Sequence, residues 1–341
     1  MLSETATVDE LDAKIIRGLQ LSPRIPFRVL AEILRVSEQT AARRYRRMQK
    51  AGIVRVTAVL SPTALRQSNW VVRVRCKPSG AVSLAQALAQ RDDLSWVTLA
   101  AGGSEILCVL RSRTTQAREE LLMQRLPRTA PVLDISAAML LHRFIGAGRT
   151  ATDDWAGLAD LLDDDETRAV LETMDLQPPA ADARYAVDAD DLTLVELLTA
   201  DGRTSYARLA QGLGVTEARA ARRLRALVEG GALYLDVDVS VADLGMRCAA
   251  TLWLSVTPAE LHRAGEALAL TPEVAFAGAI TGPQNLTATV VCRDVEHLYS
   301  FVTARVGAIA GVQSLEVVPV LRHVKQAGAM VDGHRLAPAP Q

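Results

Sequence analysis

Residues 8–54 of this chain recur at residues 187–233 without a gap, each position matching one 179 residues later. The identical positions include Asp9 and Asp188, Ala41–Arg44 and Ala220–Arg223, and Gly52 and Gly231. An ungapped match in which apolar residues replace only apolar residues indicates an internal duplication. The chain must therefore fold as two related units, which constrains its architecture and its stoichiometry together.

The repeated unit has the pattern of a small helical module. Apolar spacing and β-branched content predict three short helices and then a strand, in the first copy over residues 9–20, 27–34, 38–50 and 53–60. Ser37 stands where it caps the third helix, and Gly52 stands where that helix ends. Three short helices followed by a strand are typical of a winged helix-turn-helix.

The two copies differ at the turn before the third helix. The second copy has Gly214 in this turn, and the first has Arg35. If the turn needs a positive φ, Arg35 costs on the order of 1 kcal/mol relative to glycine. We therefore expect the second copy to form its turn with less strain.

A second pattern follows each module, and its two copies lie 180 residues apart, with Trp96 matching Phe276. Strand-like and helical segments follow one another in the order β-α-β-β-α-β, which indicates a ferredoxin-like fold. The predicted segments are 69–76, 81–90, 94–100, 106–110, 114–126 and 132–140 in the first copy, and 249–256, 259–269, 274–280, 286–292, 294–306 and 312–321 in the second.

The predicted fold class is α+β, with two winged helix-turn-helix domains and two ferredoxin-like βαββαβ domains in tandem. The winged domains are assigned to residues 1–61 and 187–240, and the ferredoxin-like domains to residues 62–145 and 241–327. Residues 146–186 are expected to form an acidic, partly helical linker. Residues 328–341 are rich in Gly, Pro and Ala and are expected to be a flexible tail.

Several classes of protein are disfavoured by composition. The four cysteines, Cys76, Cys108, Cys248 and Cys292, lie far apart and form no C-x-x-C, which argues against a disulfide framework or a structural zinc site. The first residues lack the pattern of a signal peptide, and no run of 18 apolar residues occurs. We therefore expect a cytoplasmic protein that makes no membrane contact and holds no metal or cofactor.

The third helix of the first copy is strongly basic. A helix capped by Ser37 presents its first N–H groups to a phosphate. Gln39, Thr40 and Arg43 are then placed to meet base edges, whereas Arg44, Arg47 and Lys50 suit backbone phosphates. Within a helix-turn-helix pattern we interpret this face as a contact surface for double-stranded DNA. The alternative is a solvated basic face.

The second copy repeats this helix with less charge. It offers Thr216, Arg219, Arg222 and Arg223, but has Ala226 and Glu229 in place of Arg47 and Lys50. We assign the threonine and the three arginines to DNA contact. The alternative is that this second module is kept only for packing or pairing. Unequal helices predict an asymmetric operator.

Each ferredoxin-like pattern contains a polar turn between its second and third strands. A glycine turn with exposed N–H groups suits a carboxylate, and a nearby Glu or Asn side chain suits an ammonium group. An ordinary hairpin turn is the alternative. The candidate effector-binding residues are Gly102, Gly103, Ser104 and Glu105 in the first copy, and Gly282, Gln284 and Asn285 in the second.

These motifs together resemble the Lrp/AsnC family of regulators. The resemblance rests on V-D-E-L-D-A-K-I-I, on L-A-E-I-L-R-V-S-E-Q-T-A-A-R-R-Y-R-R-M-Q-K-A-G-I-V, and on T-G-P-Q-N-L with A-G-V-Q-S-L-E-V-V-P-V-L-R-H-V-K. It implies DNA-binding winged helices and ferredoxin-like domains that pair. It also implies an amino acid or related small molecule as effector, and a homo-oligomer formed through the ferredoxin-like domains.

The chain departs from the family pattern at Arg35, which replaces the usual turn glycine, and in the two polar turns, which lack the usual acidic-aromatic-acidic run. Siroheme decarboxylases resemble the same two-domain build, but neither copy has their histidine after the wing. No catalytic motif occurs, so we predict no catalytic residue. The favoured function is a transcriptional regulator; the alternatives are such a decarboxylase and an effector-binding or assembly protein with a vestigial helix-turn-helix.

Overall fold

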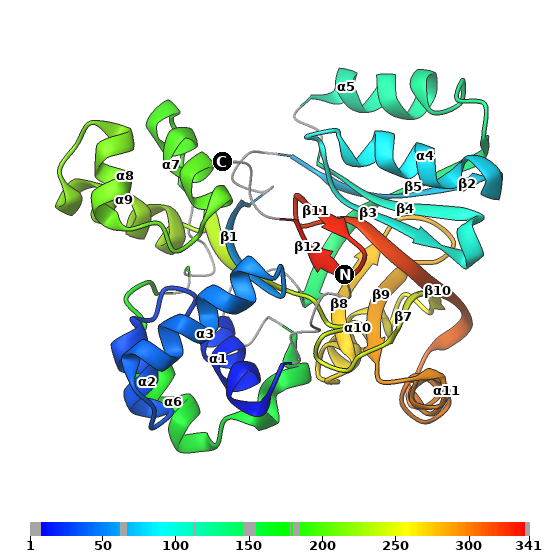
Figure 1. The fold of residues 1–341 in the computed structure, drawn as a ribbon. Coiled ribbons are helices and arrows are strands. Elements are labelled where there is room, and N and C mark those ends of the chain that lie inside the picture. Colours follow the sequence, from blue (N-terminus) through cyan, green and yellow to red (C-terminus); the bar gives the residue numbers. More distant parts are fainter. Residues whose placement is uncertain are drawn as a thin grey trace, which may run out of the picture.

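The computed structural model of this chain describes residues 8–61, 67–111, 114–145, 155–177, 179 and 185–337. Two helical modules lie on one side of the molecule, and the large sheet with its covering helices lies on the other (Figure 1). The predicted α+β class, with winged helix-turn-helix and ferredoxin-like parts, is confirmed.

The helical modules have the same elements in the same order. The first contains α1 (Glu10–Leu21), α2 (Phe27–Ile33), α3 (Glu38–Lys50) and β1 (Val54–Leu60), and the second contains α7 (Ala189–Ala200), α8 (Tyr206–Leu213), α9 (Glu217–Glu229) and β6 (Leu233–Val239). Each first helix begins with a reciprocal capping box, Asp9 with Asp12 and Asp188 with Asp191. Strands β1 and β6 pair antiparallel along their full lengths, so the two wings form one ribbon.

The turn before the third helix has a left-handed backbone in both modules. Arg35 has a φ of 55° and Gly214 a φ of 64°. The prediction that this turn needs a positive φ is confirmed, and only the second module has the residue that suits it.

Each ferredoxin-like part follows the predicted order of elements. The first contains β2 (Asn69–Cys76), α4 (Pro78–Ala89), β3 (Leu94–Ala100), η1 (Ala101–Gly103), β4 (Glu105–Arg111), α5 (Thr115–Glu119), η2 (Glu120–Arg125) and β5 (Val132–Ile145). The second contains β7 (Cys248–Val256), α10 (Leu261–Ala269), β8 (Val274–Ile280), β9 (Leu286–Cys292), α11 (Val295–Ser300), η4 (Phe301–Arg305), η5 (Val306–Ala308) and β10 (Val312–Gln326).

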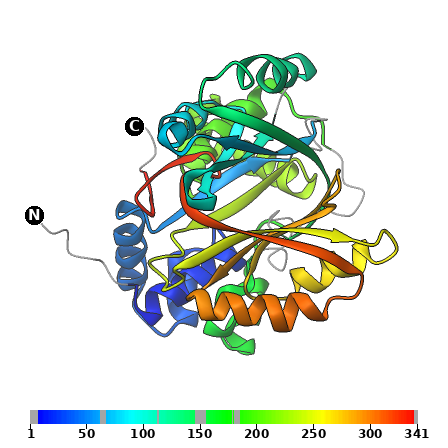
Figure 2. The ribbon, with the colours of Figure 1, turned by 90° about the vertical axis from the view of Figure 1, so that its right-hand side faces the viewer.

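The last strand of each part is longer than the sequence pattern predicts, because it crosses into the other part. Strand β5 pairs with β2 up to Met139 and then with β8 from Leu140 onward. Strand β10 pairs with β7 up to Pro319 and then with β3 from Val320 onward. Register shifts interrupt both crossing segments; such bulges bend and twist a strand. Figure 2 shows β10, in orange to red, running across the molecule.

The crossing strands close the sheet on itself. Going round the ring, the order is β3, β4, β2, β5, β8, β9, β7 and β10, and β10 pairs again with β3. The strands have two apolar faces. Val72, Val97 and Ile106 point outward against α4, and Leu252 and Leu286 point outward in the core that contains the α10 residues. The residues between them therefore point into the ring.

The acidic linker packs on the first helical module. It contains η3 (Ala156–Leu161) and α6 (Asp164–Glu172). Trp155, Leu158 and Val170 belong to the same hydrophobic core as the apolar side of α1. Residues 146–154, 178 and 180–184 of the predicted linker lie outside the described residues.

The expected flexible tail differs from the structure over residues 328–337. This segment contains β11 (Ala329–Asp332), which pairs with β10, and β12 (Arg335–Leu336). Leu336 is buried, and its N–H donates to the carbonyl of Gly52. The Gly, Pro and Ala content favours a flexible tail, but the extended part of β10 offers a free strand edge, and β11 pairs with it. Residues 338–341 lie outside the described residues.

Candidate functional site

Helix α3 presents a charged face to solvent. Ser37 caps the helix, accepting from the Thr40 N–H at 3.1 Å. Gln39, Arg43, Arg46 and Lys50 are exposed and Thr40 is half-buried. Arg43, Arg46 and Lys50 have no ion pair with any residue that the structure describes. Their charges are therefore available to a partner outside the chain.

Two of the predicted DNA-contacting residues of α3 are bonded within the module. Arg44 contacts Asp9 at 2.5 Å and Asp12 at 3.1 Å, and Arg47 also contacts Asp12, whose side chain is fully buried. The hydrogen bond from Arg44 lowers the pKa of Asp9. These pairs fasten α3 to the first turn of α1. The phosphate contacts assigned to Arg44 and Arg47 stay predictions.

Helix α9 repeats this arrangement with fewer unpaired charges. Thr216 caps the helix, accepting from the Arg219 N–H at 3.3 Å. Arg219 and Arg222 are exposed. Arg223, the counterpart of Arg44, bonds to Asp188 at 2.7 Å and so fastens α9 to α7.

A linker residue also contacts α9. Asp175 bonds to Arg225 at 2.9 Å and accepts from the hydroxyl of Tyr206 at 3.1 Å. The acidic linker therefore reaches both helical modules, packing on the first and pairing with the third helix of the second.

Each helical module donates hydrogen bonds from one arginine to backbone carbonyls of the other module. Arg24 donates to the carbonyls of Gly202 and Thr204 at 2.6 and 2.8 Å. Arg203, located 179 residues later, donates to the carbonyls of Pro23 and Ile25 at 2.7 and 2.8 Å. The sequence analysis did not identify this pair, although the same residue at the same place in both copies was a usable signal.

Stacking strengthens this reciprocal contact. The guanidinium of Arg203 lies 4.3 Å from the ring centre of Phe27, and that of Arg24 lies 4.9 Å from the ring centre of Tyr206. Burial lowers the pKa of Arg203. Together with the β1–β6 ribbon, the arginines fix the position of one module relative to the other.

The two polar turns of the ferredoxin-like parts meet at one ionic cluster. Glu105 bonds to Arg73, with the closest atoms 2.5 Å apart, and Arg73 also bonds to Glu316 at 2.8 Å. Gln284 donates to Glu316 at 3.0 Å. The guanidinium of Arg73 lies 4.5 Å from the ring centre of Trp253. The cluster joins the two halves across one end of the ring.

The other candidate effector-binding residues shape the turns. Asn285 is bonded to both backbone groups of Val256, accepting at 2.9 Å and donating at 2.8 Å. The Ser104 hydroxyl donates to the carbonyl of Ala101 at 2.8 Å. The turn glycines with positive φ are Gly102, Gly103 and Gly282. Effector binding at these turns stays a prediction.

In the described part of the chain, no helix is both long and apolar enough to span a membrane. No group of three or more His, Cys, Asp or Glu side chains is arranged there to hold a metal ion.

Family models match three parts of the chain. An AsnC-type helix-turn-helix domain matches residues 8–49 and again residues 187–228. A domain described as the Lrp/AsnC ligand binding domain matches residues 249–330. The double match agrees with the duplication found in the sequence.

Individual relatives match one half of the chain at a time. An uncharacterized HTH-type transcriptional regulator of Pyrococcus abyssi is 27% identical over 42% of this chain and 92% of its own length. The HTH-type transcriptional regulator LrpA of Pyrococcus horikoshii is 25% identical over 41% of this chain and 99% of its own length.

A solved structure matches almost the whole chain. The siroheme decarboxylase NirDL aligns with a TM-score of 0.61 over 93% of both chains, at 14% identity. This likeness shows a shared fold.

Proposed function

The chain belongs to the Lrp/AsnC family of DNA-binding transcriptional regulators, and from this premise we propose that its two winged-helix modules bind one asymmetric operator as a single unit. The observation that carries the proposal is the reciprocal bonding of Arg24 and Arg203, which fixes the two modules relative to each other. Paired modules of this kind meet successive major grooves about 34 Å apart. One chain thus supplies the two modules that a dimer of single regulators supplies.

We assign the main sequence-reading role to the first module. Gln39, Thr40 and Arg43 lie on the first two turns of α3, the part that meets base edges in such modules. Lys50 adds an exposed charge at the end of the helix, suited to a phosphate. Arg44 and Arg47 hold the helix in place through their bonds to α1.

The second module is assigned a weaker contact. Arg219 and Arg222 are its exposed guanidinium groups on α9, and Glu229 occupies the position of Lys50. Both modules then contribute to affinity, while most of the sequence preference comes from the first.

The remaining parts of the proposal concern regulation and assembly. The chain acts in the cytoplasm without catalysis, responds to a small metabolite such as an amino acid, and assembles through its ferredoxin-like parts. The family match to a ligand binding domain supports the effector. Sedimentation of the purified chain tests assembly: a strictly monomeric species at all concentrations would contradict it.

The experiment that tests the operator is in vitro selection of duplex DNA with the full chain, followed by affinity measurements at two salt concentrations. We expect an enriched motif without two-fold symmetry and a steep fall of affinity with salt. A perfect palindrome would contradict the asymmetric operator. No enrichment, with weak salt-sensitive binding alone, would contradict sequence-specific recognition.

A further inference from the structure

A cavity of about 390 Å³ extends from the interior of the ring of strands to the β1–β6 ribbon and to Trp155 of the linker, and it is partly open to solvent. Alternate residues that point away from the covering helices line it, including Val71 of β2, Leu107 of β4 and Thr289 of β9. Eight-stranded barrels either fill their interior with side chains or hold one small ligand. The volume falls in the range of about 300–1,000 Å³ typical of ligand sites.

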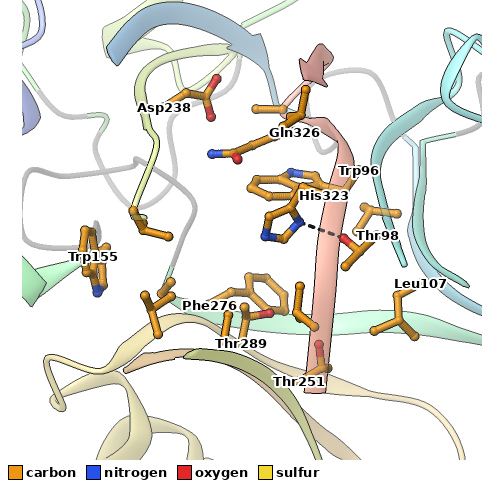
Figure 3. Close-up of a pocket in the computed structure, with 18 of the residues that line it drawn as sticks. Trp96, Thr98, Leu107, Trp155, Asp238, Thr251, Phe276, Thr289, His323 and Gln326 are labelled. Atoms are coloured by element: carbon orange, nitrogen blue, oxygen red, sulfur yellow. Dashed lines mark hydrogen bonds between the residues drawn. The ribbon is translucent and has the colours of Figure 1, made fainter. Parts of the chain in front are cut away.

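Flat rings surround this cavity. Figure 3 shows Trp155 on one side, Trp96 and His323 on the opposite side, and Phe276 toward the floor. Trp96 and His323 are fixed edge to face, with ring centres 5.7 Å apart. The Thr98 hydroxyl bonds to His323 Nδ1 at 3.0 Å, which holds the imidazole in place. Such walls suit a planar aromatic ligand, because rings gain by stacking and edge contacts.

The polar groups of the cavity have an excess of positive charge. Four arginines line it: Arg111, Arg143, Arg247 and Arg322. The lining carboxylates are Asp236 and Asp238, and Asp238 is already paired with Arg55 at 3.1 Å. Burial raises the pKa of both aspartates, that of Asp238 to about 7. The Nε of Arg111 is buried and has no hydrogen-bond partner among the described residues, so a carboxylate on the ligand would pair with Arg111.

The cavity is not symmetric although the chain is duplicated. At the spacing of 180 residues, Arg111 corresponds to Val291 and Arg143 corresponds to His323. One side therefore offers guanidinium groups and the other an imidazole and an aliphatic side chain. A homodimer would offer two equal half-sites, but this cavity favours one ligand in one orientation.

The cavity also touches the elements that position the helical modules. Trp155 lines it and packs in the core of the first module. Val237 and Val239 of β6 line it as well, and β6 pairs with β1. A ligand that contacts both would shift the balance between arrangements of the two modules.

We propose that this cavity is an effector site, additional to the turns predicted from the sequence, and that it binds one planar aromatic carboxylate per chain. The word effector rests on the proposed function as a DNA-binding regulator, whereas the site and the ligand class rest on the cavity alone. The site differs from the two polar turns, whose clustered side chains bond to one another at the far end of the ring.

The test is calorimetric titration of the full chain with 2-naphthoate and with its neutral analogue 2-naphthalenemethanol. We expect one 2-naphthoate per chain and at least tenfold weaker binding of the alcohol. Arg111→Gln should weaken 2-naphthoate binding at least tenfold. Thr289→Trp, which places an indole in the cavity, should abolish it. Arg263→Gln, at an exposed arginine outside the cavity, should leave it unchanged.

Circular dichroism establishes that each variant is folded, and the Thr289→Trp arm keeps the test valid if Arg111→Gln does not fold. Equal binding of acid and alcohol, two sites per chain, or full affinity in Thr289→Trp would each overturn the proposal. No binding of 2-naphthoate by the natural chain would overturn it too.

DNA binding is measured in a separate experiment, first without ligand. The proposed DNA-binding function and the proposed ligand site can then be contradicted independently of each other. Absence of operator binding contradicts the regulator and leaves the cavity result standing. With an operator in hand, saturating 2-naphthoate should change its affinity at least threefold in the natural chain and not in Thr289→Trp. An unchanged affinity would overturn the effector role.

Discussion

The two winged-helix modules share one backbone pattern but differ in the surface that they present. Both fasten the third helix to the first by an arginine, Arg44 in one and Arg223 in the other. On the exposed face of α3, Arg43, Arg46 and Lys50 form no ion pair with the described residues. In α9 the counterparts of Arg46 and Lys50 are Arg225, which is bonded to Asp175, and Glu229. Packing contacts were retained in both copies, and the contacts available to a partner diverged.

The largest expected effect is on the free energy of unfolding, from removing the reciprocal arginine contact between the two helical modules. Arg203→Ala should lower the free energy of unfolding by about 3 kcal/mol, because it leaves two carbonyls without their charged donor and empties the space beside Phe27. Arg24→Ala should lower it by about 2 kcal/mol, because Arg24 stacks on one ring, that of Tyr206, whereas Arg203 lies over the rings of both Phe27 and Tyr45. Urea unfolding measures both, with Arg263→Ala as the control. A larger loss from Arg24→Ala would reverse this comparison.

The second-largest expected effect is on operator binding by the two recognition helices, α3 and α9. Arg43→Ala should weaken operator binding by about 1–3 kcal/mol and relax sequence preference at one position. Arg222→Ala, the matched change in α9, should cost less than half as much. Fluorescence anisotropy at one fixed salt concentration measures both. Equal losses would show that the two helices read DNA alike, and the asymmetric operator would have to be abandoned.

The ring offers a comparison that depends on pH. Burial lowers the pKa of His323 to about 4 from its ordinary 6.5. The unfolded chain therefore takes up this proton more readily than the folded one between these values, and stability is lost as pH falls from 6.5 to 4. The counterpart of His323 in the other half is Arg143.

Between pH 6.5 and pH 4 the free energy of unfolding of the natural chain should fall by about 1–2 kcal/mol more than that of His323→Asn. A fully shielded imidazole would give a larger fall, but His323 faces a cavity. Urea unfolding at several pH values measures the difference. Thr98→Val keeps the imidazole and should keep the slope. A pH-independent difference between the natural chain and His323→Asn would contradict the burial of a neutral imidazole.

The smallest expected effect is at the left-handed turn. Arg35→Gly should raise the free energy of unfolding by about 1 kcal/mol, and Gly214→Ala should lower it by about 1 kcal/mol, because both positions have a positive φ. Thermal or urea unfolding measures both. If Arg35→Gly has no effect, contacts of the arginine side chain offset the backbone strain.

Much of the fold could be predicted because its signals are local. The Ser37 cap, the glycine at position 52 and the strand-like segments 69–76 and 249–256 are each recognised from a few neighbouring residues. The structure has these elements within a few residues of the predicted ends. The duplication extended each local pattern to a second place in the chain.

The sequence did not predict the extension of β5 and β10, because the signal for it is not local. Residues 141–145 and 322–326 continue as strand only because β8 and β3 of the other half accept them. The same holds for the hairpin at residues 329–336, which pairs on the extended β10.

Local sequence patterns predicted two winged helix-turn-helix modules, two ferredoxin-like parts and the family that they resemble. Three features depend instead on how distant elements pack: Arg24 and Arg203 bond across the modules, Arg44 and Arg47 bond to the start of α1, and the strands close around a cavity. Helical and strand periodicity report which side of an element is apolar. They do not report which distant backbone accepts a side chain, because that depends on how elements more than a hundred residues apart come together.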